Sequence, residues 1–219
     1  MKHKRPQTRG EEIANVASHA AGLVAALTAF PILVVVTARH GSVSNIVAAC
    51  IYASTMVLMY LSSTLYHSMP QGRLKQIFRQ FDHAAIFLLI AGTYTPFTFS
   101  VLAGAWGWTI FGLVWGLAAL GLFLMFSNRL NNPWLSNGIY LLMGWLIIIA
   151  AVPLFRNIST AGAVWLIAGG LAYTGGVAFY ALDGRLRYGH FIWHLFVLTG
   201  TVCHFFAVLY GCTPGATLA

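Results

Sequence analysis

The feature that most constrains this fold is a series of seven apolar segments, each about the 20 residues that a helix needs to cross a bilayer. Only 7% of the 219 residues are charged. A soluble domain carries roughly 25% charged residues, so this chain cannot cover a water-facing surface. We predict an all-α membrane protein, because helices satisfy their own backbone hydrogen bonds in lipid. The predicted spans are residues 13–37, 44–66, 81–102, 106–126, 134–155, 161–181 and 189–210.

The positions of the basic residues predict how these spans are oriented. Ten of the 12 Lys and Arg residues fall before the first span or in the second–third, fourth–fifth and sixth–seventh loops. Cytoplasmic loops carry such an excess, so residues 1–12 form a basic cytoplasmic N-terminus and the C-terminus lies outside. No linker divides residues 1–219, which we expect to form one integral membrane domain without a cleaved signal. The net charge of +8 lies in short loops and does not indicate nucleic-acid binding.

Two histidines at the start of the last span predict a metal site. His190 and His194 are four residues apart, so in a helix they share one face and can bind one ion. Taken alone, they also fit an interfacial pair bonded to loop carbonyls. The predicted topology places His67, at the end of the second span, and Asp82, at the start of the third, on the same side of the membrane. These four residues therefore lie at one membrane depth.

Three histidines with an open position are typical of a catalytic zinc site. Zinc is the first candidate, and iron and manganese are alternatives. Asp82 is able to bind the metal, orient a ligand histidine or hold the metal-bound water, and it also suits the N-cap of a helix. Ser63, four residues before His67, suits a hydrogen bond at the site or helix packing.

Other polar residues receive structural interpretations. Glu12 and His19 share a helix face and either pair with basic loop residues or support the metal ligands. His83 points away from Asp82 and suits a packing or loop contact. His204 lies ~21 Å along a helix from His190, too far for the same ion, and is expected to make a buried polar contact.

Several motifs together resemble the hemolysin III family, which belongs to the progestin and adipoQ receptor group. They are Ser63-x-x-x-His67, Asp82 opening the third span and His190-x-x-x-His194 opening the seventh. Further stretches similar to bacterial members are Gly10-Glu11-Glu12-Ile13-Ala14-Asn15, Ser18-His19, Phe81-Asp82-His83 and Gly92-Thr93-Tyr94-Thr95-Pro96. The resemblance covers about residues 10–210.

The resemblance implies seven helices, a cytoplasmic N-terminus and one zinc ion bound by His67, His190 and His194. It also implies that Asp82 holds the zinc-bound water and that Ser63 lines the site. Alkaline ceramidases share the metal pattern more distantly, and bacterial members are described as haemolysins and as membrane-homeostasis proteins. A multi-pass location in a bacterial inner membrane follows from the same resemblance.

Three functions are compatible with these observations. The leading hypothesis is a zinc-dependent intramembrane hydrolase of a lipid amide or ester, acting in membrane lipid homeostasis on a membrane lipid such as a ceramide-like amide, with free fatty acid as a further possible ligand. The alternative is a non-enzymatic lipid sensor or receptor-like protein with a structural zinc. A pore-forming cytolysin is the third, and the scarcity of polar helix faces argues against it.

Overall fold

The computed structural model describes residues 5–130 and 133–213, with the backbone alone for residues 133 and 134. All regular structure within these ranges is helical, as the sequence predicts. The elements are α1 (Arg9–His40), α2 (Val43–Ser68), α3 (Arg73–Phe99), α4 (Gly104–Phe126), α5 (Pro133–Trp145), the 3-10 segment η1 (Leu146–Ala150), α6 (Ala151–Asn157), α7 (Thr160–Leu182) and α8 (Gly189–Gly211).

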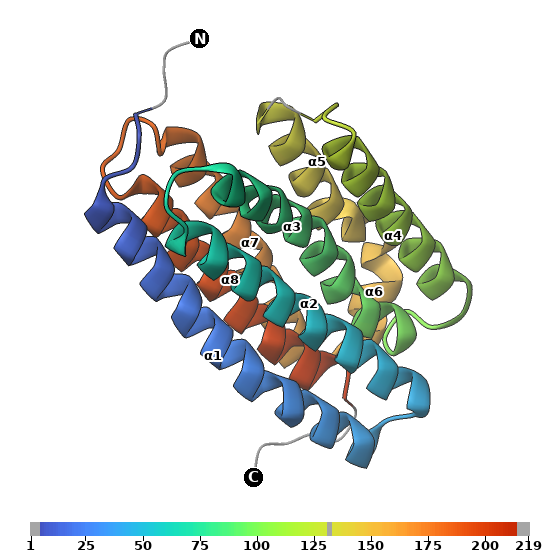
Figure 1. Cartoon of the computed structure of the whole chain (residues 1–219). Helices are drawn as coiled ribbons and strands as arrows, with labels where there is room; N and C mark the ends of the chain where they lie inside the picture. The colour runs from blue at the N-terminus through green and yellow to red at the C-terminus, as the bar shows by residue number, and fades with distance from the viewer. Residues whose placement is uncertain (1–4, 131–132, 214–219) are drawn as a thin grey trace.

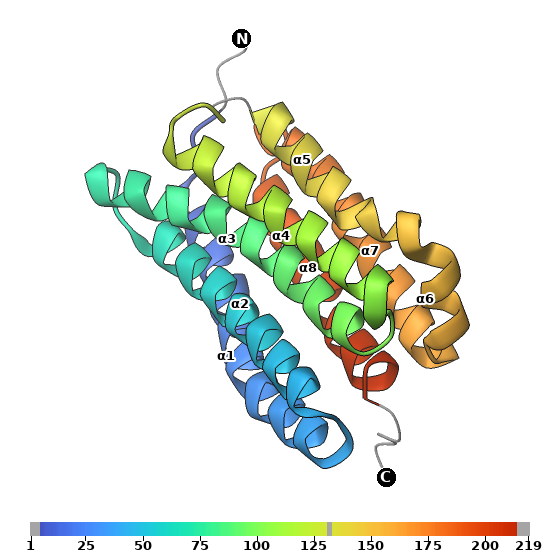
Figure 2. The same cartoon turned by 90° about the vertical axis from the view of Figure 1, so that its right-hand side faces the viewer.

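The helices lie along the long axis of an elongated bundle (Figures 1 and 2). Helix α8 packs against α7 and α1, while α2 packs against α1 and α3. Helices α1 and α8 begin at the same end of the bundle, and α2 ends there (Figure 1). The end of the bundle at which α1 begins therefore collects the polar first turns of α1 and α8 and the last turn of α2.

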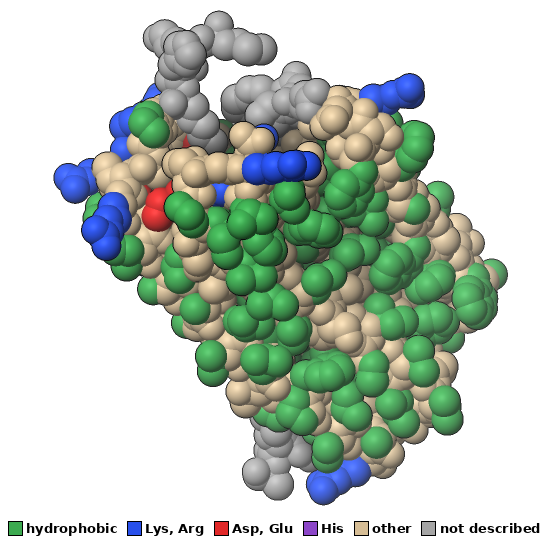
Figure 3. All heavy atoms as spheres, in the orientation of Figure 1, with side chains coloured by type: hydrophobic (Ala, Val, Ile, Leu, Met, Phe, Trp, Pro, Cys, Tyr) green, Lys and Arg blue, Asp and Glu red, His purple; other side chains and the backbone are tan. Residues whose placement is uncertain are grey.

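The outer surface of the bundle is that of a membrane protein. Large apolar side chains such as Val24, Leu120, Phe123 and Val164 are exposed. Figure 3 shows hydrophobic side chains covering the middle of the visible face. Lys and Arg side chains gather at the end where α1 begins (Figure 3). This distribution is typical of a membrane protein, whose apolar side chains face the hydrocarbon core while its charged side chains lie at the two ends of the bundle.

Among the described residues, six helical stretches are long and apolar enough to cross a membrane: Arg9–His40, Val43–Ser68, Gly104–Phe126, Leu135–Asn157, Thr160–Leu182 and Gly189–Gly211. Helix α3, which contains the third predicted span, is not among them. The described chain begins at one end of the bundle and α8 finishes at the other (Figure 1), which suits an odd number of crossings. The count of seven spans and the cytoplasmic N-terminus stay predictions.

Helix α3 begins earlier than the sequence suggests. It starts at Arg73 instead of Phe81, after Gly72, whose φ of 155° favours glycine. Asp82 is thus inside the helix, and the interpretation of Asp82 as an N-cap is wrong. The additional turns bring the buried Lys75 to Glu12 of α1, where Nζ lies 2.8 Å from Oε1. An ion pair between helices stabilises a segment that sequence hydropathy assigns to a loop.

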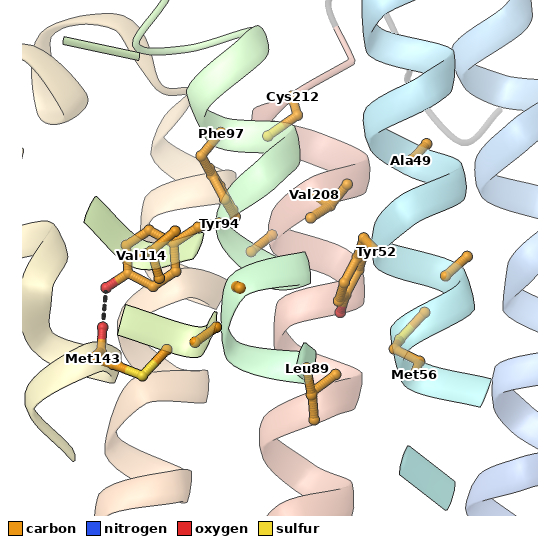
Figure 4. Close-up of a cluster of buried hydrophobic side chains, with 14 of the residues drawn as sticks. Ala49, Tyr52, Met56, Leu89, Tyr94, Phe97, Val114, Met143, Val208 and Cys212 are labelled. Atoms are coloured by element: carbon orange, nitrogen blue, oxygen red, sulfur yellow. Dashed lines mark hydrogen bonds between the residues drawn. The ribbon is translucent and has the colours of Figure 1, made fainter. Parts of the chain in front are cut away.

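The fifth predicted span, residues 134–155, is not one continuous helix. It is interrupted by η1 between α5 and α6. Pro153 has no backbone N–H and its ring crowds the carbonyl four residues earlier, which explains an irregular segment at this place. The Tyr94 hydroxyl accepts from Ile147 N at 2.9 Å and lies 2.8 Å from Met143 O (Figure 4). Helix α3 thus satisfies backbone groups at the interruption.

Helices α1 and α2 approach closely at Gly22. A Cβ atom at this position would overlap the Tyr60 ring, so only glycine fits without rearrangement. One turn earlier, His19 packs edge-on against the same ring, with centroids 5.2 Å apart. This close approach places the polar first turns of α1 beside the end of α2.

Candidate metal centre

Three histidines from two helices meet at the end of the bundle where α1 begins. His67 lies in the last turn of α2, and His190 and His194 lie in the first turns of α8. One ring nitrogen from each lies within 4.8 Å of the others. The ring centroids are 5.1 Å apart for His67–His190, 5.0 Å for His67–His194 and 4.7 Å for His190–His194. Three imidazoles at this separation can hold one metal ion.

The hydrogen bonds of the two outer rings leave a lone pair on Nε2. His67 Nδ1 lies 2.7 Å from Glu12 Oε2, and His190 Nδ1 lies 3.1 Å from Asp183 Oδ2. A carboxylate only accepts, so each Nδ1 carries the proton and donates it. A neutral imidazole with a protonated Nδ1 has its lone pair on Nε2. Carboxylate–histidine pairs of this kind support many zinc ligands.

The third ring is fixed in the same tautomer by a hydroxyl. Ser18 Oγ donates to Asn15 O at 2.9 Å, so its proton is committed. It therefore accepts from His194 Nδ1, 3.1 Å away, and leaves His194 Nε2 with a lone pair. His67 Nε2 is buried and has no hydrogen-bond partner in the described ranges. Three such lone pairs fit a divalent metal ion that prefers nitrogen ligands.

All four acidic residues of the chain lie at this end of the bundle. Glu12 contacts His67 and also Lys75, and Asp183 contacts His190. The sequence predicts that Glu12 either pairs with a basic residue or supports a metal ligand. Its contact with Lys75 fits the first role, and its contact with His67 fits the second. Two of the four acidic residues, Glu12 and Asp183, therefore contact the histidine group directly.

Glu11 joins the first turn of α1 to the segment before α8. It accepts from Thr8 N at 2.8 Å in a capping box and from Tyr188 N at 2.8 Å. The Arg5 guanidinium forms an ion pair with it, and this hydrogen bond raises the pKa of Arg5 above its ordinary value. Tyr188 immediately precedes α8 and has a φ of 60°. Glu11 therefore fixes where the helix carrying His190 begins.

Ser63 and Asp82 lie beside the histidines without joining their group. Ser63 is fully buried, lines the adjoining cavity, and its Oγ has no partner in the described chain. Asp82 lines the same cavity but lies outside the group of close ligand atoms. Its Oδ2 is 3.7 Å from His83 Nδ1, which bonds to Arg79 O at 2.8 Å. His83 thus bonds within its own helix and lines the cavity together with Asp82, so the prediction that it points away from Asp82 is wrong.

His19 is more closely involved than the sequence suggests. It is 3% exposed, and its ring stacks on His194 with centroids 3.5 Å apart. Neither of its ring nitrogens has a partner among the described residues. The sequence signal for this role was the spacing of seven residues, or two helical turns, between Glu12 and His19. This spacing puts both side chains on the same face of α1, which packs against α2. Asp183 offered no comparable signal, because it reaches His190 across a loop.

A cavity of about 260 Å³ extends from the histidines into the bundle. His190 and His194 line one part, and apolar side chains such as Leu89, Phe97 and Leu154 line most of the remainder. Trp145 and Trp193 also line it. A mainly apolar cavity with the histidines at one end suits an amphipathic molecule.

Comparisons with known proteins agree with this architecture. The model of the family described as "Haemolysin-III related" matches residues 7–205. "Hemolysin-3" of Bacillus cereus is 42% identical over 209 residues, 94% of each chain. "Hemolysin-3 homolog" of Bacillus subtilis is 42% identical over 202 residues, 92% of this chain and 94% of its own. The human "Monocyte to macrophage differentiation factor" is 29% identical over 171 residues, 74% and 69% of the two chains. No solved structure matches.

Proposed function

The chain belongs to the haemolysin III-related family of membrane proteins, and within it we propose that it is a zinc-dependent intramembrane hydrolase of a lipid amide or ester. The observation that carries the proposal is the common tautomer of His67, His190 and His194, which leaves a lone pair on each Nε2 in a group whose ring nitrogens, one from each residue, lie within 4.8 Å of one another. Zinc, when bound, would act as a Lewis acid and activate water for attack on a carbonyl carbon.

The side chains around the histidine group have three further roles: they orient the metal ligands, transfer the proton and stabilise the developing charge. The three histidines hold the ion, and Glu12, Asp183 and Ser18 keep their rings in place. An Asp82 carboxylate oxygen accepts the proton of the attacking water and returns it to the leaving amine or alcohol. The unpartnered Ser63 hydroxyl donates to the carbonyl oxygen as negative charge develops there.

The cavity supports a lipid substrate. Its apolar walls accommodate a hydrocarbon chain, while the histidines and Asp82 at one end meet the polar headgroup linkage. A ceramide-like amide and a simple lipid ester both have this form, and a free fatty acid is the product or a ligand. Turnover of such a lipid at the cytoplasmic leaflet of a bacterial inner membrane would adjust lipid composition.

A non-enzymatic sensor with a structural zinc is the second candidate. The observation that favours it is that the ligands and their hydrogen-bond partners come from α1, α2, α8 and the residue that follows α7. An ion bound there would hold these segments together. The absence of a fourth protein ligand in the close group of the described residues favours catalysis, because structural zinc sites are usually four-coordinate.

Metal analysis and turnover test the proposal together. We expect about one zinc per chain in wild type, lost in His194→Ala and kept in the matched control His40→Ala, whose histidine is exposed in the last turn of α1. Zinc-loaded wild type should release fatty acid from a panel of long-chain N-acyl amides and esters, and Asp82→Asn should bind zinc without turnover. Bound zinc without turnover in wild type would favour the sensor, and folded wild type without metal would refute both.

A further inference from the structure

A second polar cluster adjoins the cavity away from the candidate metal centre. It comprises Tyr60 of α2, Tyr173 of α7, and Thr201 and His204 of α8, and we call it the deep polar cluster. Tyr173 and His204 line the cavity. At 1.5 Å per helical residue, Thr201 lies ~10 Å and His204 ~15 Å along α8 from His194. Thr201 and His204 are therefore too far along α8 to contribute to the same metal site.

Every hydroxyl proton of the deep polar cluster is already donated in a hydrogen bond within the protein. Thr201 Oγ1 donates to Val197 O at 3.0 Å. It must then accept from Tyr60 at 2.9 Å and from Tyr173 at 2.7 Å, because each hydroxyl has one proton. The Tyr173 oxygen keeps a lone pair but has no proton left to offer.

His204 presents an acceptor for the same reason. Its Nε2 lies 3.3 Å from Leu166 O, a carbonyl that only accepts, so Nε2 carries the proton. Nδ1 therefore has the lone pair, and it is buried without a partner in the described residues. A buried unpaired acceptor costs free energy until a donor reaches it.

Two glycines hold the rings of Tyr173 and His204 in these positions. A Cβ atom at Gly200 would lie 2.7 Å from Tyr173 Cδ2, and one at Gly169 would overlap the His204 ring. Each ring thus packs on a bare backbone of the opposite helix. The two acceptors are fixed by packing and are not free to turn toward other donors.

The chemistry of the missing donor follows from these constraints. Tyr173 Oη and His204 Nδ1 are both hydrogen-bond acceptors. An ionised carboxylate or phosphate is excluded as their partner, because it also offers only acceptors. An ammonium group is disfavoured, because the four acidic side chains lie at the other end of the bundle. A neutral donor remains, and along an apolar lipid chain the simplest neutral donor is a hydroxyl.

We propose that the cavity selects lipids whose hydrocarbon chain carries a hydroxyl group at the depth of Tyr173 and His204. The inference rests on the proposed function to the extent that it takes the cavity as the lipid site. The polar end of the lipid lies at the histidines, and the chain passes along Val197 to the deep polar cluster. There the hydroxyl donates to His204 Nδ1 and shares its proton with Tyr173 Oη.

Binding of matched fatty acids in lipid nanodiscs tests the proposal. The probes are stearic acid and a positional series of monohydroxylated stearic acids, followed through the fluorescence of Trp145 and Trp193 in the cavity wall. One mid-chain isomer should bind about fivefold more tightly than stearic acid, as one additional neutral hydrogen bond implies. His204→Phe should abolish this preference and leave the affinity for stearic acid within about twofold.

The outcomes separate the proposal from the function on which it rests. Equal affinity for stearic acid and every isomer would overturn the hydroxyl site while leaving a lipid cavity in place. Failure of all the fatty acids to bind wild type would overturn the lipid cavity as well. If His204→Phe does not fold, Tyr173→Phe is tested in its place, because it removes the other acceptor. This variant should reduce the preference for the hydroxylated isomer. An unchanged preference in Tyr173→Phe would then overturn the role of the cluster.

Discussion

Replacing Glu12 by Gln should weaken metal binding without removing a metal ligand. Glu12 Oε2 holds His67 Nδ1 at 2.7 Å, while Oε1 holds Lys75 Nζ at 2.8 Å. The amide has nearly the same shape but loses the negative charge that fixes the His67 tautomer and pairs with Lys75. Loss of such a supporting group typically lowers metal affinity by about 10–100-fold, which corresponds to about 1.4–2.8 kcal/mol.

The measurement is a competition titration of zinc against a chelator of known affinity, in detergent at neutral pH. Glu11→Gln is the matched control, because Glu11 is the adjacent residue of the same type and contacts Thr8, Arg5 and Tyr188 instead of a histidine. Glu11→Gln should lower the unfolding temperature and change the zinc affinity less than Glu12→Gln does. Unchanged affinity in Glu12→Gln would refute the orienting role, and an equal loss in both variants would mean that the whole end of the bundle loosens.

Three further results are expected. Removing zinc with a chelator should lower the unfolding temperature of wild type and leave that of His194→Ala unchanged, since ligand at a thousandfold excess over Kd stabilises by about 4 kcal/mol; thermal scans with and without chelator check this. Ser63→Ala should leave stability unchanged or slightly higher, because Oγ is buried without a partner in the described chain, while lipid turnover falls; a parallel loss of both would contradict this. Gly22→Ala should cost about 1–3 kcal/mol through overlap with Tyr60, measured by denaturant unfolding, and a neutral effect would show that α1 can shift.

The histidine group could be anticipated because it depends on simple periodicities. Four residues separate His190 from His194, and the alternation of loops across a membrane puts His67 on their side. The structure brings these three rings together at the same end. The predicted all-α membrane architecture depends equally on composition and segment length.

Other features depended on contacts that no local pattern records. The early start of α3 is accompanied by an ion pair between Lys75 and Glu12 of another helix. The partner of His190 is Asp183, which belongs to a polar loop in the sequence. The interruption at η1 had a signal in Pro153, but its stabilisation by Tyr94 required the packing of α3 against this segment.

The arrangement gives α1 a specific part in the site although it supplies none of the three close ligands. Glu12 and Ser18 hold the protons of His67 and His194 on Nδ1, and His19 stacks on His194. These contacts need α1 to lie close to α2, which Gly22 allows at the Tyr60 ring. A change that moves α1 outward would release two ligand rings at once. Metal affinity and the position of α1 are therefore coupled through hydrogen bonds to Nδ1, and a ligand that separates α1 from α2 would weaken metal binding without touching the ion.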